Sequence, residues 1–212
     1  VNENGELGKT ECWYILDAEE NSELIYGHTA KTKEEFNRGI DEEEWDDLFI
    51  REKVKKGDFF YIPAGTLHAI GAGNLIYEVQ QNSDTTYRVY DYDRVDKDGN
   101  KRELHIEKTK DVTTVPFEKV QLGKEVYEVG NIKVTQLAEE RYFGVYKIEV
   151  SGDAELTKNG TGNLFTVLEG QGHITVDNEV YDIKKGDSFI LTTQCSSFLL
   201  DGDMLLIGSY DR

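Results

Sequence analysis

Cysteine is scarce in this chain of 212 residues, and its scarcity excludes two common ways of stabilising a fold. Cys12 and Cys195 are its two cysteines, and they lie far apart in the sequence. Two such residues provide neither a disulfide framework nor the closely spaced pairs that are typical of structural zinc sites. Each lies in an apolar, strand-like stretch. We therefore expect two buried free thiols and a reducing, cytoplasmic location.

Long apolar runs and an excess of positive charge are also missing. The longest apolar runs, such as Phe189–Leu191 and Met204–Ile207, have the length of strands, whereas a membrane-spanning helix needs about 20 apolar residues. Asp and Glu outnumber Lys and Arg by 42 to 24, so the formal net charge is −18 and neither a membrane nor a nucleic-acid partner is expected. An anionic ligand would need a locally basic pocket. The candidates are Arg88, Arg94, Lys101 and Arg102.

Proline occurs only twice, and apolar and polar residues alternate along much of the chain, which is typical of an all-β protein. The first half predicts strands at Cys12–Leu16, Leu24–Tyr26, Phe59–Ile62, Leu75–Gln80 and Tyr87–Asp91. The segment Thr32–Ile50 is the exception. Thr32 can cap a helix, with Glu35 three residues later, and apolar residues recur at roughly helical spacing. This pattern predicts an insertion of two short helices within about residues 32–50.

A second series of strands follows Pro116, which suggests one domain over residues 1–115 and another over residues 116–212. Hairpin turns are predicted at Glu169–Gly172, Asp177–Asn178 and Asp201–Gly202. The predicted strands are Glu125–Val129, Ile132–Gln136, Val145–Val150, Asn163–Glu169, Gly172–Val176, Glu179–Ile183, Ser188–Leu191, Ser197–Leu200 and Met204–Ser209.

The two halves share a short sequence repeat. Val54–Phe60 reads VKKGDFF, and Ile183–Phe189 reads IKKGDSF. Such internal repetition favours two jelly-roll barrels joined in one chain. The first copy leads to His68, but no histidine follows at the corresponding place after the second copy. We therefore expect a ligand-bearing site in the first barrel only.

Three segments carry a resemblance to a known family: GKTECWYILDA (Gly8–Ala18), GDFFYIPAGTLHAIGAG (Gly57–Gly73) and DTTYRVYDYDR (Asp84–Arg94). They resemble type I mannose-6-phosphate isomerase, a zinc-dependent aldose–ketose isomerase with a cupin fold, over about Gly5 to Glu107. The resemblance implies interconversion of mannose 6-phosphate and fructose 6-phosphate through a cis-enediol, with one Zn²⁺ per chain. It implies two cupin-like barrels, the second without a metal. The oligomeric state stays open, and a monomer is plausible.

The resemblance implies that Glu11 and His68 are metal ligands on two neighbouring strands. Carboxylate and imidazole both suit Zn²⁺. Glu11 begins an otherwise apolar strand, where an inward-facing carboxylate needs a cation or a hydrogen-bond partner. His68 alone would more often be a core histidine, but its Pro-x-Gly-x-x-His frame favours the ligand.

Other site residues are predicted from the same segments. Lys9 lies two residues before Glu11, so on an extended strand both side chains leave the same face, and Lys9 could assist proton movement. The resemblance implies that Arg88 stabilises the enediolate and that Arg94 binds the substrate phosphate, although Arg94 could also pair with Asp91 or Asp93. His105 is either a pocket residue or a structural one. His28 and His173 are predicted to be surface or turn residues.

The chain begins with Val1, and in the family two further metal ligands, a Gln and a His, lie shortly upstream of the matching region. We therefore expect the 212 residues of this chain to be the C-terminal part of a longer protein. We also expect the chain alone to be inactive. One alternative is a non-catalytic sugar-binding or regulatory cupin. Another is a different cupin metalloenzyme, although such enzymes use another histidine spacing.

Overall fold

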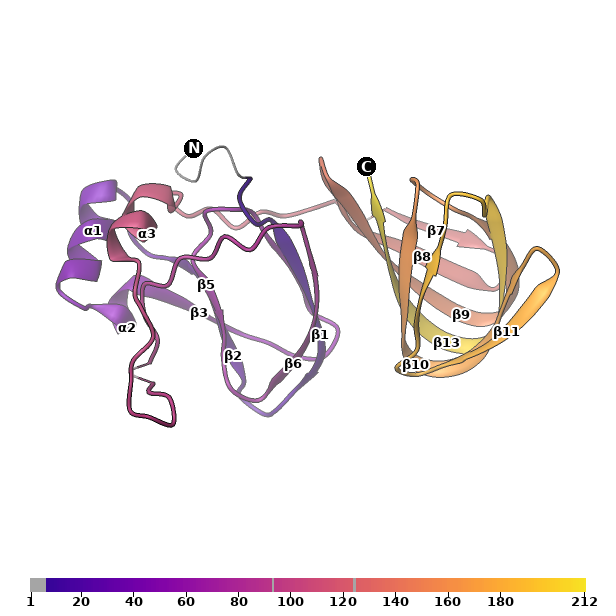
Figure 1. Ribbon diagram of the computed structural model, residues 1–212, viewed down its shortest axis with the longest axis horizontal. Coiled ribbons are helices and arrows are strands. Elements are labelled where there is room, and N and C mark those ends of the chain that lie inside the picture. The colour runs from indigo at the N-terminus through magenta and orange to yellow at the C-terminus, as the bar shows by residue number, and fades with distance from the viewer. Residues whose placement is uncertain (1–6, 93, 124) are drawn as a thin grey trace. The chain divides into compact units, whose positions relative to one another are not determined.

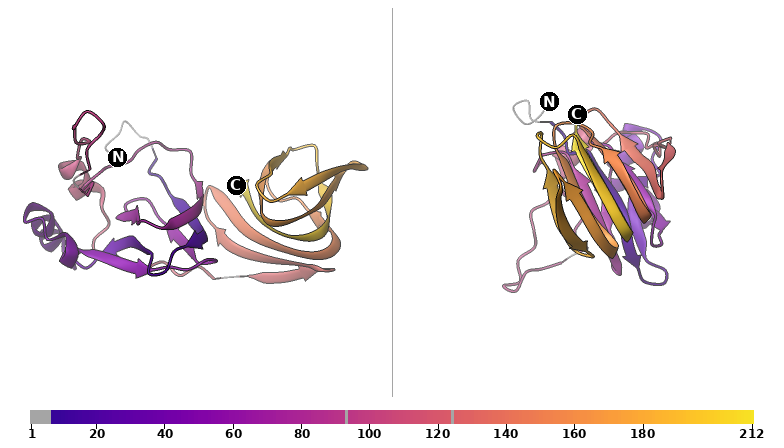
Figure 2. Two further views of the ribbon diagram at one scale, coloured as in Figure 1. Left: turned by 90° about the horizontal axis from the view of Figure 1, so that it is seen from below. Right: turned by 90° about the vertical axis from the view of Figure 1, so that its right-hand side faces the viewer.

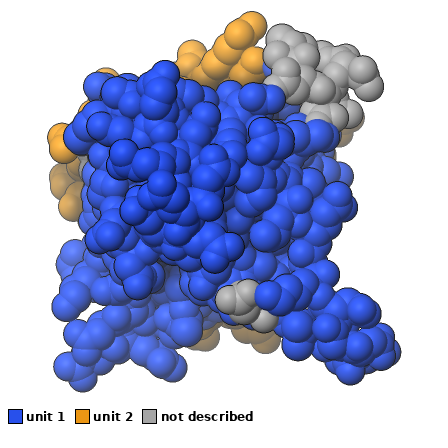
Figure 3. Space-filling model, turned by 90° about the vertical axis from the view of Figure 1, so that its left-hand side faces the viewer, with its two compact units in different colours: residues 1–120 blue, residues 121–212 orange. Residues whose placement is uncertain are grey.

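The computed structural model describes residues 7–92, 94–123 and 125–212, and most of its regular structure is β-strand, as predicted. Two compact units divide the chain, Val1–Val120 and Gln121–Arg212 (Figure 3). Their boundary lies a few residues beyond the one expected at Pro116. Within the described ranges, no helix has the length and apolar character needed to cross a bilayer.

Two small antiparallel sheets form the first unit (Figure 1). In one sheet, β1 (Glu11–Ala18) lies between β4 (Phe59–Ile62) and β6 (Asn74–Gln80). In the other, β2 (Glu23–His28) lies between β3 (Phe49–Lys53) and β5 (His68–Ile70). Alternate side chains of both sheets meet in one apolar cluster, because successive residues of a strand point to opposite faces. Its buried members are Trp13, Ile15, Leu24, Tyr26, Phe60 and Ile62.

The predicted helical insertion is confirmed as α1 (Lys33–Asp41) and α2 (Trp45–Leu48). The Thr32 side chain accepts a hydrogen bond from the Glu35 backbone N–H, which caps α1 as expected. Phe36 and Ile40 face a second apolar cluster and are buried. A further helix, α3 (Ile106–Val112), was not predicted; it contacts α1 at the same end of the unit (Figure 1).

The strand predicted at Tyr87–Asp91 is wrong, since this segment has irregular backbone. Arg88 in this segment bonds to His105 instead of a neighbouring strand: the Arg88 N–H donates to His105 Nδ1, and the His105 N–H donates to the Arg88 carbonyl. All five residues of the segment line one cavity, so the alternation of residue types in the sequence does not correspond to the two faces of a strand.

A seven-stranded antiparallel sheet forms the second unit, and Figure 2 shows how strongly its strands curve. The order is β11-β10-β13-β9-β8-β7, and β12 also pairs with β10. The curvature encloses an apolar core that includes Ile148, Phe165, Val167, Leu200 and Leu206. The strands are β7 (Val126–Val129), β8 (Ile132–Glu139), β9 (Phe143–Thr157), β10 (Asn163–Val176), β11 (Glu179–Lys184), β12 (Ser188–Leu191) and β13 (Ser197–Asp211).

Two of the three predicted turns in this unit are wrong. Glu169–Gly172 and Asp201–Gly202 lie inside the continuous strands β10 and β13, where Gly172 pairs directly with Gly202. A Cβ on Gly172 would lie 2.2 Å from the Asp201 carbonyl oxygen, so glycine here permits close approach of two strands. The turn at Asp177–Asn178 is confirmed; both residues have positive φ, 50° and 67°, as a two-residue hairpin requires.

The repeated sequence builds the same turn in both units. Gly57 and Gly186 have φ of 89° and 93°. The Gly57 N–H donates to the Ile15 carbonyl, and the Gly186 N–H donates to the Val167 carbonyl. Asp58 and Asp187 each accept a hydrogen bond from the backbone N–H three residues before them. The hydrogen bonds therefore place β1 and β10 in corresponding positions.

His28 was predicted to be a surface or turn residue, and this is wrong, because it is 2 % exposed at the end of β2. Its ring packs 4.6 Å from the Phe36 ring, and Nε2 lies 3.0 Å from the Thr114 carbonyl, to which it donates. By contrast, His173 is exposed as predicted and pairs with Asp182. Cys12 and Cys195 are buried free thiols. Burial lowers the pKa of His28.

This burial predicts a pH effect on stability. The unfolded chain takes up a proton on His28 near its ordinary pKa of 6.5, whereas the native state does so only at lower pH. The free energy of unfolding should therefore fall as the pH decreases from about 7 to about 5. His28→Gln, which can still donate to Thr114, should lose less stability over that interval. Denaturant unfolding at both pH values measures this difference, and equal pH slopes in the two proteins would contradict it.

Candidate functional site

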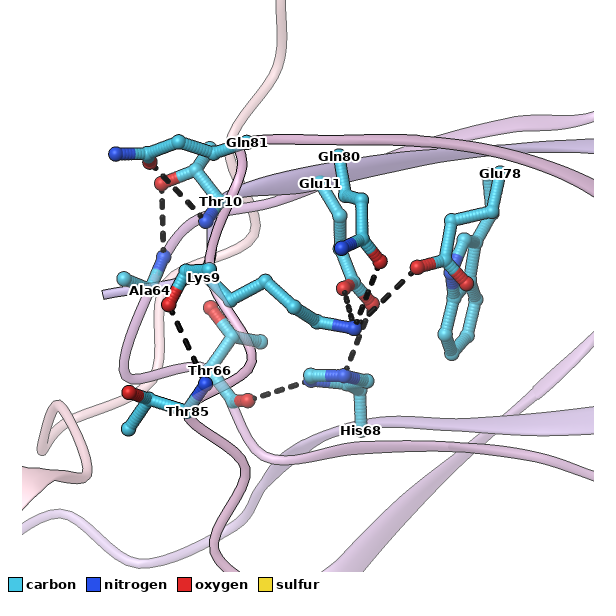
Figure 4. A network of polar contacts seen from close by, with 12 residues as sticks. Lys9, Thr10, Glu11, Ala64, Thr66, His68, Glu78, Gln80, Gln81 and Thr85 are labelled. Carbon is cyan, nitrogen blue, oxygen red and sulfur yellow. Dashed lines mark hydrogen bonds and ion pairs between the residues drawn. The ribbon is translucent and has the colours of Figure 1, made fainter. Parts of the chain in front are cut away.

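Glu11 lies at the centre of a polar network inside the first unit (Figure 4). It is the first residue of β1, pairs with Ile62 on β4 and Gln80 on β6, and is only 1 % exposed. Burial alone would raise the pKa of Glu11. The hydrogen bond and charge of His68, together with neighbouring Lys9, outweigh that effect and hold the pKa below its ordinary value. Glu11 is thus a buried, ionised carboxylate.

His68 faces Glu11 from the other sheet. The two residues were predicted to lie on neighbouring strands, but β1 and β5 belong to different sheets whose side chains meet. His68 Nδ1 lies 2.7 Å from the Thr66 carbonyl, which can only accept, so Nδ1 carries a proton. In a neutral imidazole, Nε2 then presents a lone pair to Glu11 Oε1 at 3.1 Å. Two acceptors at this distance require a proton or a metal ion.

The distance between Glu11 Oε1 and His68 Nε2 fits that of two ligands in a zinc site. Two tetrahedral ligands with Zn–N and Zn–O bonds of about 2.0–2.1 Å lie about 3.3 Å apart, close to the observed separation. The Nδ1–H bond to a backbone carbonyl is the outer contact that usually orients a metal-binding histidine. The described residues contain no group of three or more His, Cys, Asp or Glu arranged for a metal ion. Glu11 and His68 thus have the chemistry and spacing that two ligands of a zinc site would need.

Lys9 lies beside this pair, on the face that its spacing from Glu11 predicts. Its Nζ is 2.7 Å from Glu11 Oε2 and 3.3 Å from both Glu78 Oε1 and Gln80 Oε1. Burial lowers the pKa of Lys9, but Glu11 and Glu78 outweigh it and raise the pKa above its ordinary value. Trp13 in turn donates to Glu78 Oε2 at 3.2 Å. Lys9 is thus a charged donor held in one place.

A cavity of about 510 Å³ brings the predicted site residues together. Lys9, His68, Arg88 and Arg94 all line it, although they are spread over much of the sequence of the unit. Glu11 lies behind Lys9 and His68. Aromatic residues, among them Phe49, Tyr87, Tyr90 and Tyr92, complete the wall.

His105 is a structural residue and does not line the cavity. Its Nδ1 accepts from the Arg88 N–H at 3.1 Å, and its own N–H donates to the Arg88 carbonyl at 2.7 Å. The Arg88 side chain donates to the Glu103 carbonyl at 3.3 Å. These contacts hold Arg88 in irregular backbone. Sequence analysis could not assign this role, because it depends on a contact across the 89–104 loop.

Asp91 pairs with Arg94, as one of the two alternatives from the sequence predicted, but its contacts with Arg88 and Arg102 were not predicted. It is 8 % exposed, and three arginines surround it. Arg102 donates to both carboxylate oxygens, with Nε 2.7 Å from Oδ2. Arg94 Nη2 lies 3.1 Å from Oδ1, and Arg88 Nε lies 4.0 Å from it. The hydrogen bond from Arg102 and the charges of the three arginines hold the pKa of Asp91 below its ordinary value. Asp93, the other predicted partner of Arg94, lies outside the described residues.

The second unit has other residues at the positions that correspond to Glu11 and His68. Glu11 and Asn163 stand four residues before the matched Ile15 and Val167, and each pairs with the strand after the repeated turn. Asn163 is 0 % exposed and donates to the Tyr146 hydroxyl at 2.5 Å. Phe198 packs edge-on against Phe165 here, as His68 packs against Trp13 in the first unit. By the spacing from the repeated turn, Ser197 follows Gly186 as His68 follows Gly57, so an amide and a hydroxyl stand where the first unit has an acid and an imidazole.

Comparison with known proteins places the chain in a family. The model of the mannose-6-phosphate isomerase cupin domain matches residues 133–211. The chain is 48 % identical over 202 residues to the mannose-6-phosphate isomerase ManA of Bacillus subtilis, covering 95 % of this chain and 64 % of that protein. It is 46 % identical to the mannose-6-phosphate isomerase of Streptococcus mutans, covering all of this chain and 67 % of that protein. It therefore spans about two thirds of these relatives.

Solved structures agree with these relatives. The crystal structure of the mannose 6-phosphate isomerase from Bacillus subtilis superposes with a TM-score of 0.93 at 45 % identity, covering 98 % of this chain and 66 % of that one. A mannose 6-phosphate isomerase solved with bound zinc and yttrium shares the fold alone, with a TM-score of 0.71 at 13 % identity over 96 % of this chain and 66 % of that one. Together with the cavity and its residues, these similarities show that the chain belongs to the mannose-6-phosphate isomerase family.

Proposed function

We propose that the protein containing this chain interconverts mannose 6-phosphate and fructose 6-phosphate by proton transfer between C1 and C2. The observation that carries the proposal is the cavity that Lys9 and His68, both paired with buried Glu11, line together with Arg88 and Arg94. An aldose–ketose isomerase needs charge stabilisation at the reacting oxygens and a cationic contact for the phosphate. The relatives bear the name of this activity.

Each site residue has a proposed role in the isomerisation. Glu11 and His68 would hold a divalent ion, which we propose to be one Zn²⁺ per chain. When bound, such an ion polarises a carbonyl or hydroxyl oxygen and so supports enediol chemistry. Lys9, fixed beside Glu11, donates to a substrate oxygen near the reacting carbons. Arg88, held by His105 and Glu103, stabilises negative charge on the enediolate. Arg94, on the outer wall, binds the phosphate.

For the second unit we propose a cupin-like barrel without a metal. Two residues support this proposal: Asn163, which is hydrogen-bonded to Tyr146, stands at the position of Glu11, and Ser197 stands at the position of His68. In the first unit we propose that residues 1–115 form the C-terminal part of the catalytic cupin domain. The name of the relatives does not favour a non-catalytic sugar-binding role.

An NMR assay tests the proposed activity. The full-length protein, supplied with Zn²⁺, is incubated with mannose 6-phosphate in D₂O. We expect fructose 6-phosphate to form and both sugars to approach equilibrium. A control incubation with mannose should show far less conversion, because the phosphate contact is missing. Binding of mannose 6-phosphate without any conversion would contradict the proposal and would instead indicate a binding protein.

A further inference from the structure

Asp91 lies close to three cationic side chains: Arg88 and Arg94, each three residues away in the sequence, and Arg102, eleven residues away. Arg88 comes from the irregular segment after β6, and Arg94 comes from the turn in which its N–H donates to the Asp91 carbonyl at 3.0 Å. Arg102 follows a small hairpin in which Val95 pairs with Lys101. All three guanidinium groups lie close to the Asp91 carboxylate, and all four residues line the cavity.

The charge balance of this group favours an anion. Among the described residues of this cluster, one carboxylate faces three guanidinium groups, so positive charge outnumbers negative charge on this wall of a cavity in an acidic protein. The side chains of Arg94 and Arg102 are 62 % and 52 % exposed, whereas that of Asp91 is 9 % exposed. The cationic groups therefore face solvent, and the acid lies behind them. Paired guanidinium groups are well suited to phosphate oxygens.

The hairpin that carries Arg102 has its own internal support. The Asp96 side chain accepts from the backbone N–H groups of Asp98 and Asn100 at 2.8 and 2.9 Å, and Gly99 has a φ of 83°. On the other side, the Arg94 guanidinium lies 5.2 Å from the centre of the Tyr92 ring. Each arginine is thus held by its own segment, and Asp91 is the contact that they share.

We infer that Arg102 is a second phosphate-binding residue and that Asp91 is a positioning residue, which holds Arg94 and Arg102 as a paired clamp for the phosphate of the substrate. This inference rests on the proposed function for the identity of the substrate, a phosphate monoester. Asp91 acts through the arginines and does not touch the phosphate. A negative charge is tolerated next to an anion site because the three arginines neutralise it.

Asp91 could affect phosphate binding through its negative charge or by positioning Arg94 and Arg102. Substitution of Asp91 has opposite expected effects in the two cases, so it distinguishes them. If Asp91 mattered only through its charge, Asp91→Ala would remove a negative group and strengthen phosphate binding. If Asp91 positions the clamp, the same substitution releases Arg94 and Arg102 and weakens binding. We expect Asp91→Ala to raise KM for mannose 6-phosphate about tenfold, with kcat changed much less. Arg102→Gln should raise KM on the order of tenfold to a hundredfold, since it removes charge-assisted hydrogen bonds.

The experiment uses the full-length protein and two readouts. The first is kcat and KM with mannose 6-phosphate. The second, which does not need turnover, is a titration with inorganic phosphate followed by ¹H–¹⁵N NMR. Asp91→Asn keeps the shape of the side chain and one acceptor, so it should lie between the wild type and Asp91→Ala. Arg141→Gln, an exposed arginine of the second unit, is the matched control and should leave both readouts unchanged. Circular dichroism checks that every variant folds.

The outcomes distinguish this inference from the proposed function. Weaker inorganic phosphate binding in Arg102→Gln and Asp91→Ala supports the inference, even if the wild type does not isomerise mannose 6-phosphate. Unchanged phosphate affinity and KM in folded Arg102→Gln would overturn the role of Arg102, even if the enzyme is active. Tighter phosphate binding in Asp91→Ala or Asp91→Asn would overturn the positioning role.

Discussion

Arg88→Ala is expected to lower kcat for mannose 6-phosphate isomerisation at least about a hundredfold while KM changes by much less. Arg88 lines the cavity together with Lys9 and His68, and its backbone is held by two hydrogen bonds to His105. A preorganised cation whose attraction to the substrate grows when negative charge develops on the enediolate stabilises the transition state more than the bound substrate. Its loss therefore appears in kcat.

Steady-state kinetics on the full-length protein measure this effect. Arg88→Lys keeps a positive charge but loses the planar guanidinium, so it should recover only part of the activity. Arg141→Ala serves as the control for the loss of an arginine elsewhere. Near-normal kcat with a raised KM in Arg88→Ala would show that Arg88 binds the phosphate and does not act on the reacting carbons.

Removal of the His68 imidazole is expected to abolish stable metal binding. His68 Nε2 points at the buried Glu11 carboxylate, and its orientation is fixed by the Thr66 carbonyl. Loss of a residue that merely orients a ligand weakens metal affinity about 10- to 100-fold, so loss of the ligand itself should cost at least that much. We expect the full-length wild-type protein to carry one divalent ion per chain and His68→Ala to carry little after dialysis.

Elemental analysis after dialysis gives the metal content directly. His173→Ala is the matched control, because His173 also pairs with a carboxylate but lies exposed on β10 of the second unit. That variant should keep its metal. A metal content that is the same in His68→Ala and the wild type would show that the ion is held elsewhere, and equal loss in both variants would exclude a site confined to the first unit.

Local features could be predicted well from the sequence. Thr32 and Glu35 marked the start of α1, Asp177–Asn178 marked a tight turn, and the repeated GD segment marked the same turn in both units. Each depends on contacts among residues that are close in sequence, where backbone conformation and side-chain chemistry act directly. The two turn predictions that were wrong also came from short sequence patterns. Glycines at 170, 172 and 202 are typical of turns, but here they allow close pairing of β10 with β13.

The sequence by itself therefore determined the predominance of β-strand, the helical insertion, and the residue types of the candidate site. The tertiary structure alone decided how that site is assembled. Glu11 and His68 come from different sheets. The backbone of Arg88 is held by a hydrogen bond to His105, and the Asp91 carboxylate lies close to three arginines. The physical reason is that strand period and capping act over a few residues, whereas the register of sheets and the closure of loops depend on the whole packed unit.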